Sequence, residues 1–322
     1  MYFSTNSFSK KFRKDYLLLS GMAHCMTDVS LFNLEMERCI KMEKKVLLLS
    51  NTVLGNVEDL ELYNFLVKNQ LNIKMTWVDI PNEELDNYDL ILRRNTWTGS
   101  KADAKTLQYY KEHKNRVIKY AKDKKIKYVN LEGLDDIGKS YLEELYDSSA
   151  ENEVIPTITD IKNMEKLPKV DYYYVKENES LGSGIGQTKV SGDEVDGVVK
   201  SKYEDGNYII QPEIEFKSEV QVYFINEEYL YTFEYTPSKF PNYPDPERKD
   251  DICTIKAKYF LSKIRKPVGF SRIDFLKLED DSLMLLEIED SSPNMNFRYL
   301  DATTKNLVMS KYLDLVKSIL EK

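Results

Sequence analysis

Histidine and cysteine are scarce in this chain of 322 residues, which contains two histidines and three cysteines. His24 and His113 lie in ordinary contexts and disfavour a Ser-His or Cys-His triad or a histidine-rich metal site. Cys25, Cys39 and Cys253 have no paired spacing, which disfavours a disulfide framework and a zinc site and agrees with a reducing, cytoplasmic setting. Lysines, arginines and carboxylates must therefore carry any chemistry.

Long hydrophobic runs and an excess of positive charge are also missing. No apolar run reaches the roughly 18 residues that a membrane-spanning helix needs, so no membrane partner is expected. The 46 basic and 54 acidic residues leave a net charge of -8, which gives no general attraction to nucleic acid. Any anionic ligand must therefore be held by local groups.

The most informative stretch of the sequence is a predicted β-hairpin. Two runs of alternating apolar residues, Phe270–Leu278 and Leu283–Glu289, flank an acidic turn, which is typical of two antiparallel strands joined by a tight loop. A loop of two residues and a loop of four residues give the same register. The pairing of opposed residues can therefore be predicted without knowing the turn type.

This register gathers charged side chains on one face of the hairpin. Asp274 is expected opposite Glu287, and Arg272 opposite Glu289, and side chains two apart on a strand share a face. The other, apolar face is expected to hold Ile273, Phe275, Leu286 and Ile288. Opposed Cβ atoms lie roughly 4.5–5.5 Å apart, where two carboxylates repel unless a cation lies between them. The pattern favours a divalent metal site, and a surface hairpin neutralised by Arg272 is the alternative.

The first half of the chain shows the alternation of strands and helices that is typical of an open α/β lobe. Strands are predicted at 44–50, 73–78, 88–94 and 127–130, and helices at 57–69 and 101–122. Only Gly55 follows the first strand, where a dinucleotide fold needs a run of glycines to receive a pyrophosphate. The sequence therefore disfavours a dinucleotide-binding domain of the usual kind.

Two lysines and a glycine-rich loop indicate phosphate binding. Lys139 begins a predicted helix, and Lys176 ends the predicted strand 170–176. The stretch Leu181–Gly186 follows, and its glycines expose backbone N–H groups that suit phosphate oxygens. The alternatives are a solvated helix end for Lys139 and an ordinary flexible hairpin loop for the glycines.

The remaining predicted elements are mostly strands. They are strands 208–214, 219–225 and 229–235, a loop at 235–251, a helix at 252–264 and an amphipathic helix at 303–322 that covers a sheet. Pro212 cannot donate a hydrogen bond to a ladder, so the chain must leave the sheet or lie at its edge there. Such a break frees backbone groups that can bind a flat ligand.

The ordered set of a lysine, a lysine with a glycine loop, a broken strand and a carboxylate hairpin resembles the ATP-grasp superfamily from Lys44 to the C-terminus. The resemblance implies an α/β (α+β) fold in which an open N-terminal α/β lobe precedes two α+β lobes whose antiparallel sheets enclose the nucleotide. The implied segments are an N-terminal extension (1–42), an N-terminal α/β domain (43–130), a small lobe with the glycine-rich loop (131–210) and a C-terminal lobe with the metal-binding hairpin (211–322).

The resemblance also implies roles for individual residues. Phosphate contacts fall to Lys139, Lys176, Gly182, Ser183, Gly184 and Gly186, adenine contacts to Gln211, Pro212, Glu213 and Ile214, and ribose contacts to Glu219. The implied cofactors are ATP and Mg²⁺, with Mn²⁺ as an alternative metal, and the metal ligands are Asp274, Glu287 and Glu289. Arg272 is implied to stabilise the oxyanion of a tetrahedral intermediate.

Within the superfamily the sequence is most similar to the glutathione-synthetase and D-alanine-ligase type, and especially to the cycloserine-ligase-like branch. The stretches Leu92–Trp97, Lys139–Leu142 and Glu287–Glu289 carry this resemblance. Two features depart from it. Glu177 stands where a proline usually follows the strand lysine, and the loop after Tyr235 lacks a basic glycine-rich motif.

The implied function is an ATP-dependent carboxylate–amine ligase that acts on an amino acid or small peptide. Such a ligase forms an amide bond through an acyl phosphate and releases ADP and phosphate. The positioning and charge neutralisation that phosphoryl transfer requires match the lysines and carboxylates of the sequence. A small-molecule kinase and a nucleotide-binding protein without turnover are the alternatives, and a homodimer is an open alternative for the assembly.

Overall fold

The structure is a computed structural model, and it describes residues 44–51, 57–96, 104–179, 186–203, 206–236, 252–264 and 268–322. The predicted extension 1–42, the loop residues Gly182, Ser183 and Gly184, Trp97 and most of the loop after Tyr235 lie outside the described residues. Residues 44–322 belong to one unit by their contacts. No helix in the described ranges is both long enough and apolar enough to cross a membrane.

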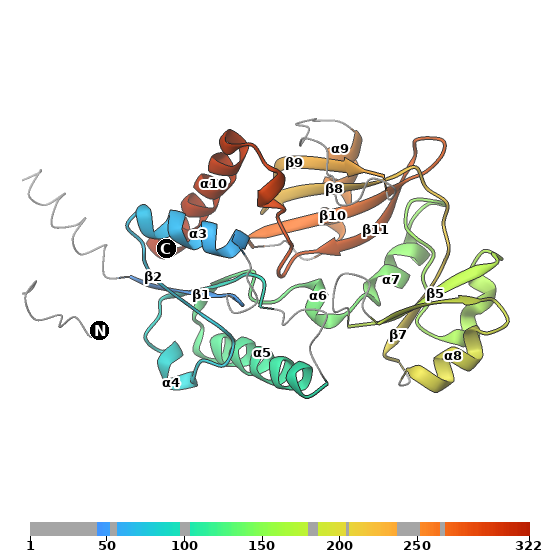
Figure 1. Cartoon of the computed structure of the whole chain (residues 1–322), viewed down its shortest axis with the longest axis horizontal. Coiled ribbons are helices and arrows are strands. Elements are labelled where there is room, and N and C mark those ends of the chain that lie inside the picture. The colour runs from blue at the N-terminus through green and yellow to red at the C-terminus, as the bar shows by residue number, and fades with distance from the viewer. Residues whose placement is uncertain are drawn as a thin grey trace, which may run out of the picture. The chain divides into compact units, whose positions relative to one another are not determined.

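The N-terminal part of this unit is a parallel sheet with strand order β2-β1-β3-β4. Strands β1 and β2 of this sheet are labelled in Figure 1. Its elements are β1 (Lys45–Leu49), α3 (Val57–Lys68), β2 (Asn72–Thr76), α4 (Asn82–Leu85), β3 (Leu90–Arg93), α5 (Ala104–Lys124) and β4 (Lys127–Val129). The predicted alternation of strands and helices is therefore confirmed, and the one-turn helix α4 is an addition to it.

Both faces of this sheet are covered, which explains why β1 is apolar at consecutive positions. Val46 and Leu48 point into a core that includes α3 and the C-terminal helix α10 (Ala302–Glu321). Leu47 and Leu49, on the other face, pack in a second core with α5. A strand buried on both sides cannot show the alternation of polar and apolar residues that marks a half-exposed strand.

A small antiparallel sheet follows, with strand order β6-β5-β7. The elements of this region are α6 (Leu134–Ile137), α7 (Tyr141–Ser148), η1 (Ile161–Lys166), β5 (Tyr172–Glu177), β6 (Gln187–Ser191), α8 (Val195–Lys202) and β7 (Tyr208–Pro212). Pro212 ends β7, which lies at an edge of the sheet, so the prediction from its missing N–H is confirmed. Strand β6 and helix α8 are additions that the sequence did not predict.

The C-terminal sheet is antiparallel, with strand order β11-β10-β8-β9. Its elements are β8 (Ser218–Ile225), β9 (Glu228–Tyr235), α9 (Ile252–Lys263), β10 (Phe270–Lys277), β11 (Leu283–Glu289) and η3 (Phe297–Tyr299), before α10 ends the chain. The predicted hairpin is thus the β10–β11 pair at one edge of this sheet. The division of the chain at residues 43, 131 and 211 stays a prediction.

The register of the hairpin is as predicted near its charged end. Arg272 pairs with Glu289, and Asp274 pairs with Glu287. The alternation of the two strands therefore puts these four side chains on one face.

Beyond Asp274 the predicted register is wrong by one residue. A β-bulge follows Asp274, so Phe275 pairs with Leu285 instead of Leu286. Leu285 is fully buried in the apolar core of this lobe, whereas Leu286 is only partly buried beside it. A bulge inserts one extra residue on one strand and shifts every later pair.

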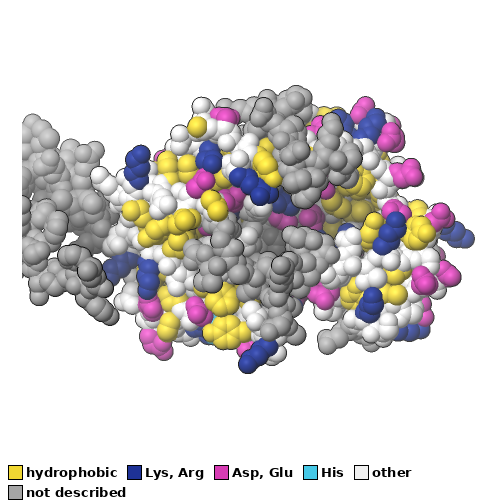
Figure 2. All heavy atoms as spheres, in the orientation of Figure 1, with side chains coloured by type: hydrophobic (Ala, Val, Ile, Leu, Met, Phe, Trp, Pro, Cys, Tyr) yellow, Lys and Arg dark blue, Asp and Glu magenta, His cyan; other side chains and the backbone are white. Residues whose placement is uncertain are grey.

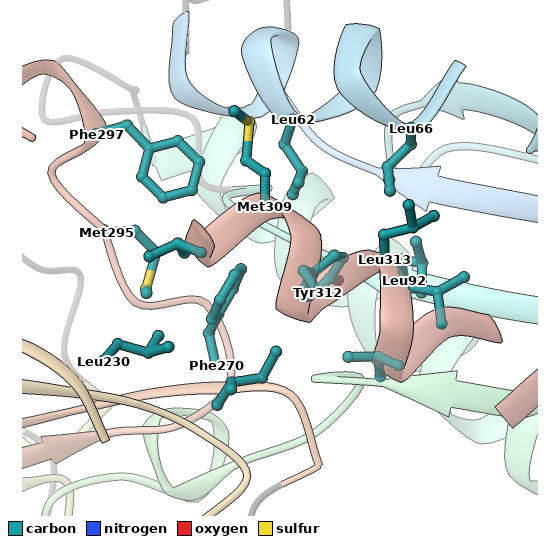
Figure 3. Packing of buried hydrophobic residues seen from close by; sticks show 14 of the residues in the cluster. Leu62, Leu66, Leu92, Leu230, Phe270, Met295, Phe297, Met309, Tyr312 and Leu313 are labelled. Atoms are coloured by element: carbon teal, nitrogen blue, oxygen red, sulfur yellow. The ribbon is translucent and has the colours of Figure 1, made fainter. Parts of the chain in front are cut away.

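One apolar core joins the N-terminal parallel sheet to the C-terminal lobe (Figure 3). Leu62 of α3 and Leu92 of β3 belong to the same cluster as Phe270 of β10 and Met309 of α10. The rings of Phe270 and Tyr312 stack at 4.6 Å between centroids. Among the described residues, the small sheet has a separate core whose members lie between Ile158 and Ile210. The packing therefore divides the unit into a joined pair of lobes and one smaller lobe.

The visible surface of the described residues mixes charges of both signs. Lys and Arg side chains are interspersed with Asp and Glu side chains over this face (Figure 2). Such mixing is the pattern of an ordinary solvated surface.

Candidate active site

A cluster of three carboxylates lies on the charged face of the β10–β11 hairpin. Asp274 comes from β10, and Glu287 and Glu289 come from β11. One carboxylate oxygen from each lies within 4.8 Å of the others. Asp274 is buried, at 1 % exposure, and the two glutamates are partly exposed. The hairpin therefore brings the three predicted metal ligands together.

The donor set of this cluster fits a hard divalent cation. Mg²⁺ takes oxygen ligands and is usually held by a few carboxylates together with substrate phosphates and water. Three carboxylates on rigid neighbouring strands supply such oxygens. Since two of them are partly exposed, ligands from solvent or from a nucleotide can complete the coordination.

Arg272 lies within the cluster and binds two of its members. Its Nε and Nη2 atoms donate hydrogen bonds to the two carboxylate oxygens of Asp274, at 2.8 Å each. The Nη2 atom is also 2.9 Å from Glu289 Oε1. Burial raises the pKa of the Asp274 carboxyl, and the guanidinium of Arg272 opposes this rise. Arg272 therefore neutralises its neighbours, as the surface-hairpin alternative predicts, but in a buried position beside the cluster.

Lys139 reaches the same cluster from the segment just before α7. Its ammonium forms an ion pair with Glu287. Burial opposes ionisation of Glu287, but the cations of Lys139 and Arg272 outweigh burial and lower the pKa of Glu287 to about 2. Glu287 is therefore a carboxylate at neutral pH, and Lys139 does not lie at a solvated helix end.

Asn178 holds the backbone around Lys139, and sequence reasoning missed it. The N–H of Lys139 donates to the Asn178 carbonyl at 2.9 Å, and the N–H of Ser140 donates to Asn178 Oδ1 at 2.8 Å. Gly138 has φ +96° and no space for a side chain, because a Cβ would lie 2.7 Å from Asn178. These contacts link the start of α7 to the end of β5 over a long sequence distance, so no local pattern reveals them.

Lys176 and Gln211 meet in the small lobe. Lys176 Nζ donates to Gln211 Oε1 at 2.7 Å, and Gln211 Nε2 donates to Thr157 Oγ1 at 2.9 Å. Burial, followed by the positive charge of Lys139, lowers the pKa of Lys176 to about 8. The carboxylates of Glu287 and Glu219 raise the pKa of Lys176 and so oppose part of this decrease. The two predicted phosphate lysines are therefore close enough to influence each other.

The predicted adenine segment connects the small sheet to the C-terminal sheet. Gln211 and Pro212 end β7, and the chain has no regular structure from there to β8. The Glu213 N–H donates to the Tyr172 carbonyl at 2.9 Å, and the Glu213 carboxylate pairs with Lys189. Ile214 packs against the core of the C-terminal lobe. The position agrees with a hinge between lobes, and the adenine contact stays a prediction.

Only one end of the predicted glycine loop is described. Gly186, at φ +74°, precedes β6, and its carbonyl accepts from the Glu177 N–H at 3.2 Å. The two strands that flank the loop, β5 and β6, are antiparallel neighbours. Phosphate binding by Gly182, Ser183 and Gly184 stays a prediction, since these residues lie outside the described ranges.

A network from the N-terminal lobe fixes the open end of the hairpin. Asn130 Nδ2 donates to the carbonyls of Phe270, at 2.7 Å, and Asp290, at 2.8 Å. The Phe270 N–H donates to Asn130 Oδ1 at 2.8 Å, and Asp290 Oδ1 accepts from the Leu134 N–H. Asn130 therefore sets the separation of the two strands that carry the carboxylates. An isolated asparagine after a strand gives no sequence signal for this role.

The arginine motif after β3 is a buried structural network in the described residues. Arg94 is fully buried and pairs with Glu58 at 2.6 Å and with Asp59 at 3.1 Å. Glu58 also accepts from the backbone N–H groups of Met295 and Phe297. This motif therefore fastens the N-terminal lobe to the segment that follows the hairpin.

Comparisons with known proteins identify the fold. No protein-family model and no curated protein sequence matches the chain. Among solved structures, D-cycloserine synthetase is similar over 86% of this chain and 99% of its own, with a TM-score of 0.63 and 14% identity. D-alanine–D-alanine ligase from Bacillus anthracis in complex with ATP is similar over 87% of this chain and 97% of its own, with a TM-score of 0.58 and 13% identity.

A third similar structure is the ATP-grasp ligase PsnB in complex with its minimal precursor. The similarity covers 84% of this chain and 99% of the PsnB chain, with a TM-score of 0.58 and 10% identity. Another structure of PsnB contains Mg and ADP. At such identities the similarity shows the fold alone. The chain therefore has the fold of these ATP-grasp ligases, which confirms the fold that the resemblance in its sequence implied.

Proposed function

We propose that this protein is an ATP-dependent carboxylate–amine ligase that forms an amide bond and releases ADP and phosphate. The observation that supports this most directly is the meeting of Lys139 with Glu287 in a cluster that also holds Asp274, Glu289 and Arg272. The cluster combines metal-binding oxygens with a phosphate-binding cation and a guanidinium. Transfer of a phosphoryl group to a carboxylate needs these groups in one place.

The two lysines bind and orient the nucleotide phosphates in this proposal. Lys139 and Lys176 come from different elements, and each already contacts a polar side chain through its ammonium. A lysine presents a compact point charge on a flexible stem, which suits a phosphate whose oxygens move during transfer. Asp274, Glu287 and Glu289 would hold Mg²⁺ or Mn²⁺, which when bound neutralises phosphate charge.

Arg272 stabilises the negative charge that develops on the acid substrate. The carboxylate oxygen of the acid attacks the γ-phosphate, the bond to the bridging oxygen breaks, and ADP leaves. The amine then adds to the acyl phosphate, its proton passes to phosphate or water, and inorganic phosphate departs. We assign to Arg272 the role of a hydrogen-bond donor to the tetrahedral oxyanion that forms in the second step.

We infer that the acid is an amino acid or a small peptide. The structures with similar folds include a D-alanine–D-alanine ligase and a ligase in complex with a precursor peptide. The acceptor pockets of such enzymes lie on loops that vary between functions on one fold. Mixtures of amino acids and dipeptides are therefore the first candidates to test.

ADP release measured with and without candidate amines tests the proposal. Release that requires both acid and amine supports the ligase, whereas release with the acid alone supports a small-molecule kinase. Absence of release with every mixture, combined with measured ATP binding, supports a nucleotide-binding protein without turnover. Asp274→Asn should abolish the release, and Asp281→Asn, in the exposed turn of the same hairpin, is the matched control.

A further inference from the structure

The carboxylates of the cluster are already engaged by cations that belong to the chain. Arg272 binds Asp274 through two hydrogen bonds and Glu289 through Nη2, and Lys139 binds Glu287. Each of the three carboxylates therefore has a positive partner in the protein without nucleotide. A metal ion can use the same oxygens only in competition with these partners.

The balance of charge makes this competition strong. The three carboxylates carry at most three negative charges, and Lys139 and Arg272 supply two positive ones. The exposure of these side chains is between 1% and 24%. A divalent cation added without displacing either partner would leave an excess positive charge in a place with little solvent to screen it.

Lys139 is the partner that a nucleotide can remove. Arg272 lies on the same strand as Asp274 and is bound to it bidentately, whereas Lys139 comes from the segment before α7. Its ammonium is expected to bind phosphate under the proposed function, and its backbone is hydrogen-bonded to Asn178, which directly follows the last residue of β5. Arrival of a phosphate next to Lys139 therefore offers it a second anion in place of Glu287.

We propose that Lys139 acts as a latch on the metal site. It holds Glu287 in the nucleotide-free protein and releases it when a nucleotide phosphate takes its ammonium, so the divalent metal enters with the nucleotide and not before it. This inference rests on the proposed function and deepens it, because it sets the order in which two ligands of one site bind. A ligand shifts such an equilibrium only through its different affinity for the two states.

Titration of Mn²⁺, followed by electron paramagnetic resonance, tests the latch without measuring activity. We expect Lys139→Met to bind Mn²⁺ about tenfold more tightly than the unmodified protein when nucleotide is absent, because a competing charge next to Glu287 is gone. Lys139→Arg keeps the charge and should bind Mn²⁺ as weakly as the unmodified protein. Lys277→Met, which removes an ammonium paired with Glu234 on the same lobe, controls for net charge.

A second titration contains a non-hydrolysable ATP analogue. The analogue should tighten Mn²⁺ binding more in the unmodified protein than in Lys139→Met, since only the former has a latch to release. Melting curves recorded first establish that each variant is folded, and Lys139→Gln replaces the methionine variant if that one is not.

Two results would overturn the inference, and only one of them would also overturn the proposed metal site. Equal Mn²⁺ affinities of the unmodified protein and folded Lys139→Met without nucleotide would disprove the latch and leave the ligase proposal intact. Failure of Mn²⁺ to bind to any variant with the analogue present would overturn both the metal site and the latch.

Discussion

Arg272 is the residue at which structural and catalytic roles are hardest to separate. Its guanidinium binds Asp274 bidentately and also contacts Glu289, so it neutralises the cluster whether or not it touches a substrate. A catalytic role predicts an effect on one half of the reaction, whereas a neutralising role predicts an effect on both. The two roles can therefore be distinguished by measuring the half reactions separately.

We expect Arg272→Ala to impair amide formation more than acyl-phosphate formation. Loss of one donor to a tetrahedral oxyanion typically costs on the order of 10²–10³ in rate, about 3–4 kcal/mol. Hydroxylamine trapping measures the acyl phosphate, and product formation with amine measures the second half. An equal loss in both assays, together with a lower melting temperature, would show that Arg272 is structural.

The lowered pKa of Lys176 predicts a pH dependence of ATP affinity. The ammonium has a pKa of about 8 because of burial and the nearby charge of Lys139, and only the charged form pairs with phosphate. ATP affinity should therefore be nearly constant below about pH 7 and fall about tenfold between pH 7 and pH 9. Calorimetry at several pH values measures this, and Lys176→Met should bind ATP weakly with little pH dependence.

Loss of structure does not explain such a fall in affinity. A lysine in the unfolded chain keeps its proton up to its ordinary pKa, so between pH 8 and that value the unfolded chain binds more protons than the folded one at this residue. The contribution of Lys176 to the free energy of unfolding therefore rises with pH in this window. An unchanged ATP affinity across pH 8 would mean that Lys176 does not bind phosphate.

At the scale of elements, the turn before α7 decides where Lys139 points. Gly138 adopts a left-handed φ of +96°, and a Cβ there would lie 2.7 Å from the side chain of Asn178. Asn178 in turn holds the N–H groups of Lys139 and Ser140. The position of the lysine is therefore set by a contact between two elements, and not by the helix alone.

We expect Gly138→Ala to lower both stability and ATP affinity. Strain at this φ costs about 1–3 kcal/mol, and the displaced Asn178 would no longer hold Lys139. Gly197→Ala is the matched control, because Gly197 lies within α8 and a Cβ there meets nothing within 4 Å. The control should gain about 1 kcal/mol from helix propensity. Thermal melting measures stability, and calorimetry measures ATP affinity. A normal ATP affinity in Gly138→Ala would contradict the role of this turn in positioning Lys139.

At the scale of the whole molecule, the cores predict which parts open together. The first core joins β1 and β3 to β8, β9, β10 and α10, while the small lobe has its own core. Independent packing lets the small lobe open without exposing the shared core. Such opening would let a nucleotide enter between the lobes that carry Lys176 and Glu287.

Hydrogen exchange can test this division. We expect Phe270→Ala, in the shared core, to cost about 3–5 kcal/mol and to speed amide exchange in β1 and β3 as well as in β8 and β10. Ile210→Ala, in the core of the small lobe, should speed exchange in β5 and β7 and leave β1 and β3 unchanged. Faster exchange in β1 and β3 of the Ile210 variant would show that the lobes unfold as one.

The sequence by itself determined the elements that depend on neighbours along the chain. Alternation along the two strands predicted the hairpin and its charged face, but the register next to the turn was wrong by one residue, and the bulge after Asp274 restores the predicted pair of Asp274 with Glu287. The missing N–H of Pro212 predicted that the chain leaves the sheet or lies at its edge there, and Pro212 ends the edge strand β7. The ordered motifs then led to the ATP-grasp fold.

Only the tertiary structure decided the contacts between residues far apart in the chain. The bulge after Asp274, the ion pair of Lys139 with Glu287 and the bonds from Asn178 have no local signal. Each depends on how packed cores bring separate elements together, and the entropy of closing long loops is recovered only when the whole unit forms. Sequence therefore names the charged groups of the site, and packing decides which of them neutralise one another.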